Sequence, residues 1–281
     1  MREFLEKICD RQDLTRDESR SLFEMFVHGE IEPLAISALL VAFRTKGETP
    51  GEIAGAASAL RQAATAFPRP DYACADSCGT GGDGANTINV STAVALVASE
   101  MGMPMVKHGN RSVSSKCGSA DLLERLGVKI DTDPEQSRRC LDQEGICFLF
   151  APQYHGGLRH AMPVRKALAI RTIFNLLGPL VNPAAPDYQV MGVYRAELCV
   201  PVAKVLGMLG CKAALVVHGQ GLDEVAIHGT TQAALYQGGA VSEMILSPEQ
   251  VGLSLYPLEQ IRGGEAEENA GAITRLLKGE G

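Results

Sequence analysis

The first 67 residues repeat their apolar positions with the period of an α-helix, and none of them has the strict alternation of a strand. In "LTRDESRSLFEMFVHGE" the apolar side chains fall on one face, and Thr15 with Glu18 forms a capping box that marks a helix start. Further helices are expected from Pro33 to Gly47 and after Thr49, because proline favours the first helical turn and glycine the end. Together with the amphipathic "FLEKI", this pattern predicts four helices.

The pattern changes at "FPRPDY" (67–72), where two prolines end the helical periodicity. Short apolar runs then alternate with amphipathic segments, which is typical of an α/β fold with a mainly parallel sheet. Antiparallel strands around a Gly-Gly turn are expected near the end, before a last helix in "EAEENAGAITRLLKG". The predicted strands are "ACADSC", "MPMVKHG", "VKID", "ICFLFAP", "YQVMGVY", "CKAALVVHG", "EVAIHG" and the two halves of "AALYQGGAVSEMIL".

Helical periodicity returns within the α/β part, in residues 156–183. We expect this segment to rejoin the first helices. The predicted architecture is a small helical domain, residues 1–70 with 156–183, packed on a larger α/β domain of residues 71–155 and 184–281.

Composition and charge exclude several classes of protein. The formal net charge of −7 argues against the broad basic surface that non-specific nucleic-acid binding needs. The N-terminal "MREFLEKICDRQD" lacks the apolar run of a secretory leader, and no apolar run is long enough to span a bilayer. The eight cysteines include no C-x-x-C pair, so buried reduced thiols are expected. We therefore expect a cytoplasmic protein without a nucleic-acid or membrane partner.

Residues 79–84, "GTGGDG", match the G-x-G-x-x-G fingerprint of dinucleotide-binding sites. The context contradicts that interpretation. The following "ANTINVST" is poor in helix formers, so the next helix is expected to begin only near Val90. About 20 positions on, where the fingerprint requires an acidic residue for the ribose, the next strand carries Lys107. The P-loop pattern also fails, because no Gly-Lys-Ser/Thr follows.

The same loop can still bind phosphate. Its glycines allow positive φ and close backbone approach, and backbone N–H groups beside a helix N-terminus form an anion nest. Asn89, Ser91 and Thr92 add side-chain donors at that helix start. Asp83 would repel a bare pyrophosphate, but not one that carries Mg²⁺. The alternative is a glycine-rich turn in which these residues serve only as caps.

Two more polar loops are expected at the same sheet edge, because the carboxyl ends of parallel strands line one crevice. Residues 107–121 bring Lys107, Arg111 and Lys116 together with serine and asparagine side chains. Asp223 and Glu224 follow the strand "AALVVHG" and carry the carboxylate oxygens that Mg²⁺ prefers. A solvated surface loop is the alternative for each of them.

With these three loops, the chain resembles the anthranilate phosphoribosyltransferases of tryptophan biosynthesis, a glycosyltransferase family that shares its fold with nucleoside phosphorylases. The resemblance covers nearly the whole chain and is specific in combination, although each motif alone is weak. The matching motifs are "GTGGD" (79–83), "NVST" (89–92), "KHGNR" with its serines (107–115), "PVR" (163–165), "RTIFNLLGPLVNP" (171–183) and "DE" (223–224).

The resemblance implies a reaction in which the amine of anthranilate displaces pyrophosphate from C1 of 5-phosphoribosyl 1-pyrophosphate (PRPP), with Mg²⁺ assisting. It implies an active site in the hinge cleft between the two domains and a homodimer formed through the helical domain. Such a reaction mainly needs positioning and a stabilised leaving group, so we assign no catalytic residue. His108 and His155 are expected to be structural or orienting.

The resemblance also implies roles for individual residues. The implied anthranilate contacts are Gly79, Asn110 and Arg165, and the implied Mg²⁺ ligands are Ser91, Asp223 and Glu224. The implied PRPP contacts are Gly79, Gly82, Asp83, Thr87, Asn89, Val90, Ser91, Thr92, Lys107, His108, Gly109, Asn110, Arg111, Ser112, Val113, Ser114, Ser115 and Ser119.

Two alternatives stay open: a pyrimidine nucleoside phosphorylase-like enzyme, and a non-catalytic nucleic-acid-binding paralogue of the same fold. "KHGNR" followed by serines favours the transferase, while the negative charge and the presence of both Asn110 and Arg165 oppose the paralogue. The chain departs from the family at Gly156 and Gly157, where many relatives have Pro-Ala. It also ends at Gly281, earlier than the resemblance leads us to expect, so that terminal helices of the α/β domain would be missing.

Overall fold

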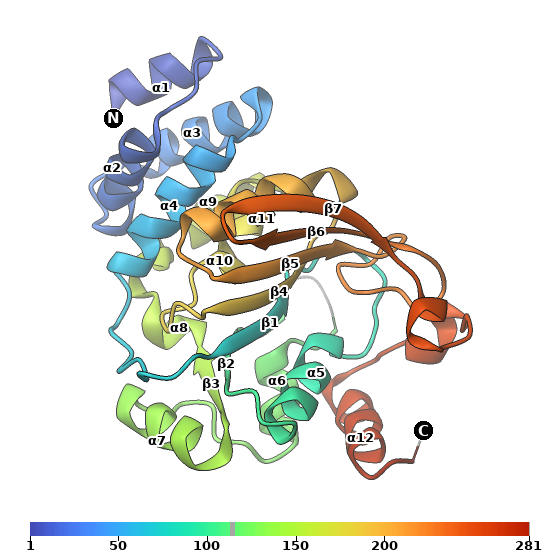
Figure 1. Ribbon diagram of the computed structural model, residues 1–281. Coiled ribbons are helices and arrows are strands. Elements are labelled where there is room, and N and C mark those ends of the chain that lie inside the picture. Colours follow the sequence, from blue (N-terminus) through green and yellow to red (C-terminus); the bar gives the residue numbers. More distant parts are fainter. Residues whose placement is uncertain (113–115, 281) are drawn as a thin grey trace.

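The computed structural model describes residues 1–112 and 116–280. Within these ranges the strands form one seven-stranded sheet in the order β3-β2-β1-β4-β5-β6-β7 (Figure 1). Strands β3, β2, β1, β4 and β5 run parallel to one another, whereas β6 and β7 pair in antiparallel fashion. This confirms the mainly parallel sheet predicted from the sequence. The strands are β1 (Ala75–Gly79), β2 (Met105–Gly109), β3 (Ile146–Phe150), β4 (Tyr188–Gly192), β5 (Ala213–His218), β6 (Thr231–Gln237) and β7 (Ala240–Leu246).

The N-terminal helices begin where the capping residues predict. Thr15 and Thr49 each accept a hydrogen bond from the backbone N–H three residues on, at 3.2 and 3.3 Å, and Glu18 and Glu52 complete both capping boxes. The helix after Pro33 ends at Gly47, whose φ of +91° suits glycine. These helices are α1 (Arg2–Cys9), α2 (Arg16–Val27), α3 (Pro33–Lys46) and α4 (Pro50–Gln62).

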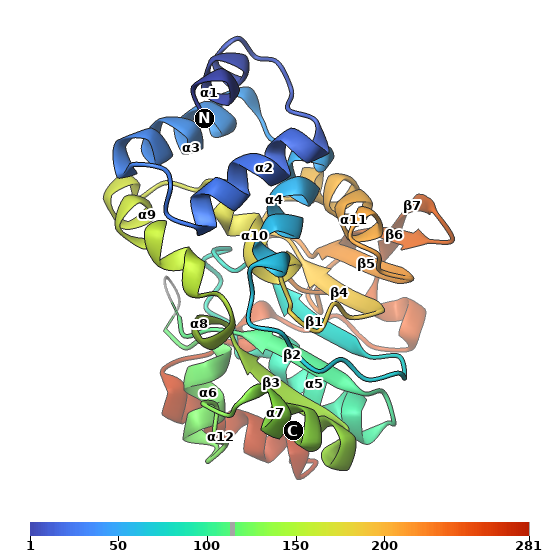
Figure 2. The same cartoon turned by 90° about the vertical axis from the view of Figure 1, so that its left-hand side faces the viewer.

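The remaining helices cover the two faces of the sheet. In Figure 1, α5, α6 and α12 lie on one face, whereas α10 and α11 lie on the other, where α4 joins them. Figure 2 shows α8 and α9 running from the end of β3 toward α3, so that the middle of the chain lies beside the N-terminal bundle. These helices are α5 (Val90–Glu100), α6 (Ser119–Arg125), α7 (Pro134–Glu144), α8 (Ala151–Tyr154), α9 (Met162–Leu168), α10 (Phe174–Leu180), α11 (Cys199–Met208) and α12 (Ala266–Leu277).

Two of the predicted strands are wrong. Residues 128–131 form no strand, because Ile130 alone is buried among them and its neighbours face solvent. Residues 224–229 form a loop, in which Ala226 donates its N–H to Thr231 Oγ1 (2.8 Å) instead of to a neighbouring strand. The helical segment 156–183 is also less regular than expected, since it consists of a 3-10 helix followed by α9 and α10.

Two other sequence predictions concern exposure and membranes. The expectation of buried thiols is wrong for Cys9 and Cys140, which are exposed on helices α1 and α7, and correct for the other six cysteines. Among the described residues, no helix has both the length and the apolar character needed to cross a bilayer.

Polar side chains fix the helical layer, which consists of α4, α10 and α11 on one face of the sheet, to the strands. Arg61, near the end of α4, donates from Nε to Leu180 O (2.7 Å) at the C-terminal end of α10, where the helix dipole favours a cation. Asn182, which is fully buried, donates to Asp76 Oδ2 (2.9 Å) and to Val106 O (2.7 Å). The chain after α10 is therefore bonded to β1 and β2, the two strands whose ends carry the phosphate-suited loops.

Two buried imidazoles lie where β2 meets the helical layer. The rings of His108 and His155 meet edge-on with centroids 5.1 Å apart. Burial lowers the pKa of His108 to about 3, helped by the neighbouring imidazole, and lowers the pKa of His155 to about 4. Both rings are therefore neutral in the folded protein at pH 7, which agrees with a structural role.

This pair predicts a loss of stability in mild acid. An imidazole in the unfolded chain titrates near pH 6.5, so between about pH 6.5 and 4 the unfolded chain binds protons that the folded chain does not. Between pH 7.5 and 5.5 the free energy of unfolding should fall by about 1 kcal/mol more in the wild type than in His155→Gln. Denaturant titrations at the two pH values measure this difference. The exposed His28→Gln variant is the control and should lose as much free energy of unfolding as the wild type between the two pH values. An equal loss in His155→Gln would contradict the prediction.

Candidate functional site

The parallel strands bring the loops singled out in the sequence to one edge of the sheet. β1, β2, β4 and β5 run in the same direction, so the segments that follow them all leave from their carboxyl ends. These segments carry the glycine loop after β1, the Lys107 loop after β2, and the Asp223–Glu224 pair after β5. Hydrogen bonds then join them directly.

The glycine loop is bonded to Asp223. Gly81 and Gly82 have φ values of +67° and +75°, and the N–H of Gly81 donates to Asp223 Oδ2 at 2.6 Å. The N–H of Asp223 in turn donates to Asp83 Oδ2 at 3.3 Å. A Cβ at Gly79 would stand 2.3 Å from Asp223 Oδ2, so the carboxylate occupies the space that the missing side chain leaves.

The N-terminus of α5 is bonded to the second carboxylate. The N–H of Ser91 donates to Glu224 Oε1 at 3.2 Å. The ammonium of Lys107, only 3% exposed, donates to Ser77 O (2.8 Å) and to Ser91 Oγ (3.4 Å). One buried cation thus lies at the start of the helix to which Glu224 is bonded.

Burial and a neighbouring acidic residue raise the pKa of both Asp223 and Glu224. Burial, and then the nearby charge of Asp83, raise the pKa of Asp223 to about 6. Burial, and then the charge of Asp223, raise the pKa of Glu224 to about 8, against the opposing effect of Lys107. A cluster with this excess of negative charge is favourable for a divalent cation.

The donor set suits Mg²⁺ only in part. Asp83, Ser91, Asp223 and Glu224 offer oxygen atoms, the ligands that Mg²⁺ prefers. Within the described ranges, however, no three acidic, histidine or cysteine side chains are arranged as a ready metal site. This fits the usual behaviour of Mg²⁺, which takes one or two carboxylates and completes its shell with substrate phosphates and water.

Two other predicted phosphate contacts, Asn89 and Thr87, already have structural partners. The amide of Asn89 donates to Cys117 O (3.1 Å) and accepts from Asn269 Nδ2 (2.9 Å) of α12, so it joins three segments. Thr87 forms a backbone bridge with Arg262. Val90 is the first residue of α5, and Thr92 in its first turn is buried. These contacts support the loop and engage both the Nδ2 and the Oδ1 of Asn89 in structural bonds.

The second loop is held against α6. Arg111 forms ion pairs with Asp121 (3.1 Å) and Glu124, rather than standing free for a phosphate. Ser119 Oγ donates to Asn110 O (3.4 Å), while the N–H of Ser112 donates to Asp121 Oδ2 (3.0 Å). Of the other predicted residues, Gly109 ends β2, and Val113, Ser114 and Ser115 lie outside the described residues.

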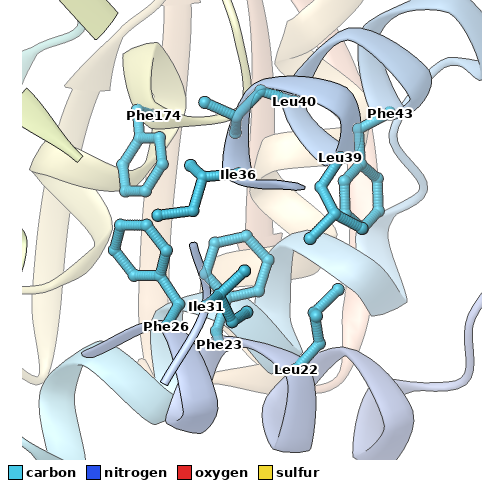
Figure 3. Close-up of a pocket in the computed structure, with 9 residues that line it drawn as sticks. All are labelled: Leu22, Phe23, Phe26, Ile31, Ile36, Leu39, Leu40, Phe43 and Phe174. Atoms are coloured by element: carbon cyan, nitrogen blue, oxygen red, sulfur yellow. The ribbon is translucent and has the colours of Figure 1, made fainter. Parts of the chain in front are cut away.

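Arg165, the predicted carboxylate-binding residue, lies on α9. It is partly buried, its Cζ is 5.4 Å from the Phe174 ring centroid, and burial lowers its pKa. No hydrogen bond or ion pair within the described part of the chain joins it to the strand-end loops, so its assigned role remains a prediction. Phe174 also lines the apolar pocket in Figure 3, whose other lining residues come from α2, α3 and the segment between them. That pocket has only aliphatic and phenyl side chains and cannot recognise a phosphate.

Sequence reasoning missed Arg171. It donates from Nη2 to Gly82 O, and its Cζ lies 4.5 Å from the ring centroid of Tyr194, which follows β4. The N–H of Tyr194 donates to Thr80 Oγ1 at 3.1 Å. Arg171 therefore connects the 156–183 segment with the glycine loop. Its position as the first residue of "RTIFNLLGPLVNP" is the one indication that the sequence contains.

Comparison with known sequences and structures identifies the chain. A glycosyl transferase family model for a helical bundle domain matches residues 2–64, and that for an a/b domain matches residues 71–281. The chain thus has the two domains of a glycosyl transferase. The chain is 56% identical over 281 residues to the anthranilate phosphoribosyltransferases of Aeromonas hydrophila and Sorangium cellulosum, and it spans 82% and 81% of their lengths. The chain belongs to the anthranilate phosphoribosyltransferase family.

Solved structures agree with this. The anthranilate phosphoribosyltransferase of Thermus thermophilus superposes with a TM-score of 0.93 at 43% identity, over 99% of this chain and 83% of that one. The Saccharomyces cerevisiae enzyme, solved in complex with PRPP and Mg, gives 0.89 at 28% identity, over 98% and 80%. The same yeast enzyme with 4-fluoroanthranilate gives 0.87 at 27% identity, over 98% and 79%. The resemblance and the fold class predicted from the sequence are confirmed.

The link through Arg171 predicts an effect on loop order. Arg171→Gln removes the charged donor to Gly82 O, so the amides of residues 79–89 should exchange with deuterium roughly three- to tenfold faster in the ligand-free protein. Hydrogen exchange followed by mass spectrometry measures this. Arg195→Gln is a matched control, because Arg195 also lies over the Tyr194 ring, with Cζ 5.4 Å from its centroid. Unchanged exchange in Arg171→Gln would show that the bond does not restrain the loop.

Proposed function

We propose that the chain transfers the phosphoribosyl group of PRPP to the amine of anthranilate, giving N-(5-phosphoribosyl)anthranilate and pyrophosphate. Membership of the family supports this, as do the relatives solved with PRPP and with a fluoroanthranilate. The observation that carries the proposal is the direct bonding of the segments after β1 and β5, through Gly81 with Asp223 and through Ser91 with Glu224. Lys107 of β2 joins them by its bond to Ser91 Oγ. The phosphorylase-like enzyme and the nucleic-acid-binding paralogue gain no support from these relatives.

The proposed step needs positioning more than a reactive side chain. The C1–O bond to pyrophosphate breaks with its electron pair on the leaving oxygen, the amine nitrogen forms the new bond to C1, and the nitrogen loses a proton to solvent. The glycine-loop amides, the start of α5 and the ammonium of Lys107 would hold the leaving pyrophosphate. Its charge would be neutralised further by Mg²⁺ held by Asp223, Glu224 and Ser91. An aromatic amine is unprotonated at neutral pH, so no base is assigned.

The proposal extends to organisation. We propose that residues 1–70 with 156–183 act as the helical domain and that residues 71–155 and 184–281 form the phosphoribosyl-binding domain, with both substrates meeting at their hinge. The packing of α9 on α3 and of α10 on α4 supports the first part. A homodimer through the helical domain and a cytoplasmic location remain predictions that follow from the family.

The test follows the loss of anthranilate fluorescence with PRPP and Mg²⁺. The purified chain should consume anthranilate only when both are present and should release one pyrophosphate for each anthranilate lost. Reactions with EDTA, and with ribose 5-phosphate in place of PRPP, serve as controls. If protein with a cooperative melting transition consumes no anthranilate, the proposed function is wrong.

Arg165 provides a sharper prediction. Arg165→Ala should raise KM for anthranilate roughly 10- to 100-fold, because a hydrogen bond to a charged group contributes about 1.5–3 kcal/mol. KM for PRPP should change far less. Lys166→Ala, an exposed neighbour on α9, is the matched control and should leave both constants unchanged. Equal increases in the two KM values would contradict the assignment of Arg165 to anthranilate.

A further inference from the structure

Two backbone donors at positions suited to a phosphate already have acceptors. The N–H of Gly81 lies in a stretch of consecutive positive-φ glycines, and the N–H of Ser91 lies in the first turn of the 11-residue helix α5. Both are typical anion-binding positions. In this structure each donates to a carboxylate of the protein itself, Asp223 Oδ2 at 2.6 Å and Glu224 Oε1 at 3.2 Å.

We propose that Asp223 and Glu224 act as internal substitutes for phosphate, and that they release Gly81 and Ser91 only on becoming ligands of the cation that accompanies pyrophosphate. This inference rests on the proposed function and adds a specificity role to it: the carboxylates exclude metal-free anions from the phosphate loop. The requirement for the cation would then have two parts, neutralisation of the substrate and removal of an internal competitor.

The backbone around Asp223 is built to admit its carboxylate. A Cβ at Gly192 would stand 1.4 Å from Asp223 O, and a Cβ at Gly79 would stand 2.3 Å from Asp223 Oδ2. Both glycines therefore allow the Asp223 chain and side chain to lie directly beneath the glycine loop. The carboxylate position is set by close backbone packing and not by a flexible surface side chain, since Asp223 is 9% exposed.

The electrostatics explain why the arrangement can be reversed. The charge of Asp83 adds to burial in raising the pKa of Asp223, and the charge of Asp223 adds to burial in raising the pKa of Glu224, which Lys107 opposes. A metal-free pyrophosphate would add further negative charge to this cluster and would have to compete for two occupied N–H groups. A carboxylate that turns toward a divalent cation loses little interaction free energy, because it exchanges one hydrogen bond for a cation–oxygen contact.

The experiment measures binding of pyrophosphate in EDTA by isothermal titration calorimetry, on the full chain. Glu224→Ala frees the Ser91 N–H and should tighten metal-free binding about tenfold or more relative to the wild type. Glu224→Gln removes the same carboxylate but keeps an oxygen that can accept from the Ser91 N–H, so its affinity for metal-free pyrophosphate should rise clearly less. Asp83→Asn removes a nearby charge without freeing Gly81 or Ser91 and should also gain less.

Two outcomes overturn the inference. In the first, Glu224→Ala binds metal-free pyrophosphate no more tightly than the wild type. In the second, all three variants gain the same affinity for pyrophosphate, which would show that the effect comes from net charge alone. Thermal melts establish that each variant is folded, and Asp223→Ala provides a second test through Gly81 if Glu224→Ala does not fold. The titration contains no anthranilate, so it is independent of the activity assay. If the variants show the expected pyrophosphate affinities but the wild type does not turn over anthranilate, only the proposed reaction is rejected. Normal turnover without the pattern would reject this inference alone.

Discussion

The close approach of the Asp223 backbone to Gly192 and Gly79 determines the rest of the site. Nothing larger than a hydrogen fits at position 192, so the loop after β5 can lie across the ends of β4 and β1. That placement brings Asp223 under the glycine loop and Glu224 to the first turn of α5. The position of the two carboxylates, their raised pKa values and their bonds to Gly81 and Ser91 follow from this backbone contact.

The helical layer is attached to the same edge by a few polar side chains. Asn182 bonds the chain after α10 to β1 and β2, and Arg171 reaches from the same segment to the glycine loop. The segment 156–183 thus has two surfaces: one packs on the N-terminal helices and the other contacts the strand-end loops. This segment therefore connects the N-terminal helices with the strand-end loops.

The sequence predicted the elements well where local chemistry decides them. The ends of α2, α3 and α4 depend on residues that act through neighbours a few positions away, namely Thr15, Pro33, Gly47 and Thr49. These helix ends could therefore be predicted from the sequence alone. "VKID" looked like a strand because apolar and charged residues alternate, but a strand also requires a partner, which depends on the fold. The loops could be assigned to one edge because parallel strands impose it.

Side-chain partners could not be read in the same way. Arg111 was expected to face phosphate and instead pairs with Asp121 and Glu124 of α6, acids that stand 10 and 13 positions away along the chain. Asn89 was expected to donate to phosphate; in the structure its Nδ2 donates to Cys117 O, 28 positions away, and its Oδ1 accepts from Asn269, 180 positions away. Arg171 contacts Gly82 across 89 positions. Such contacts depend on the assembled fold, whereas capping boxes and turns do not.

The bonds from Gly81 and Ser91 to the two carboxylates also bear on how a product leaves. A buried N–H that loses its acceptor costs free energy, so a loop that held pyrophosphate alone would resist giving it up. Under the proposed function, Asp223 and Glu224 would return to the same two donors as the product departs. The N–H groups of Gly81 and Ser91 would then keep an acceptor throughout the cycle, and the loop would empty without first becoming disordered.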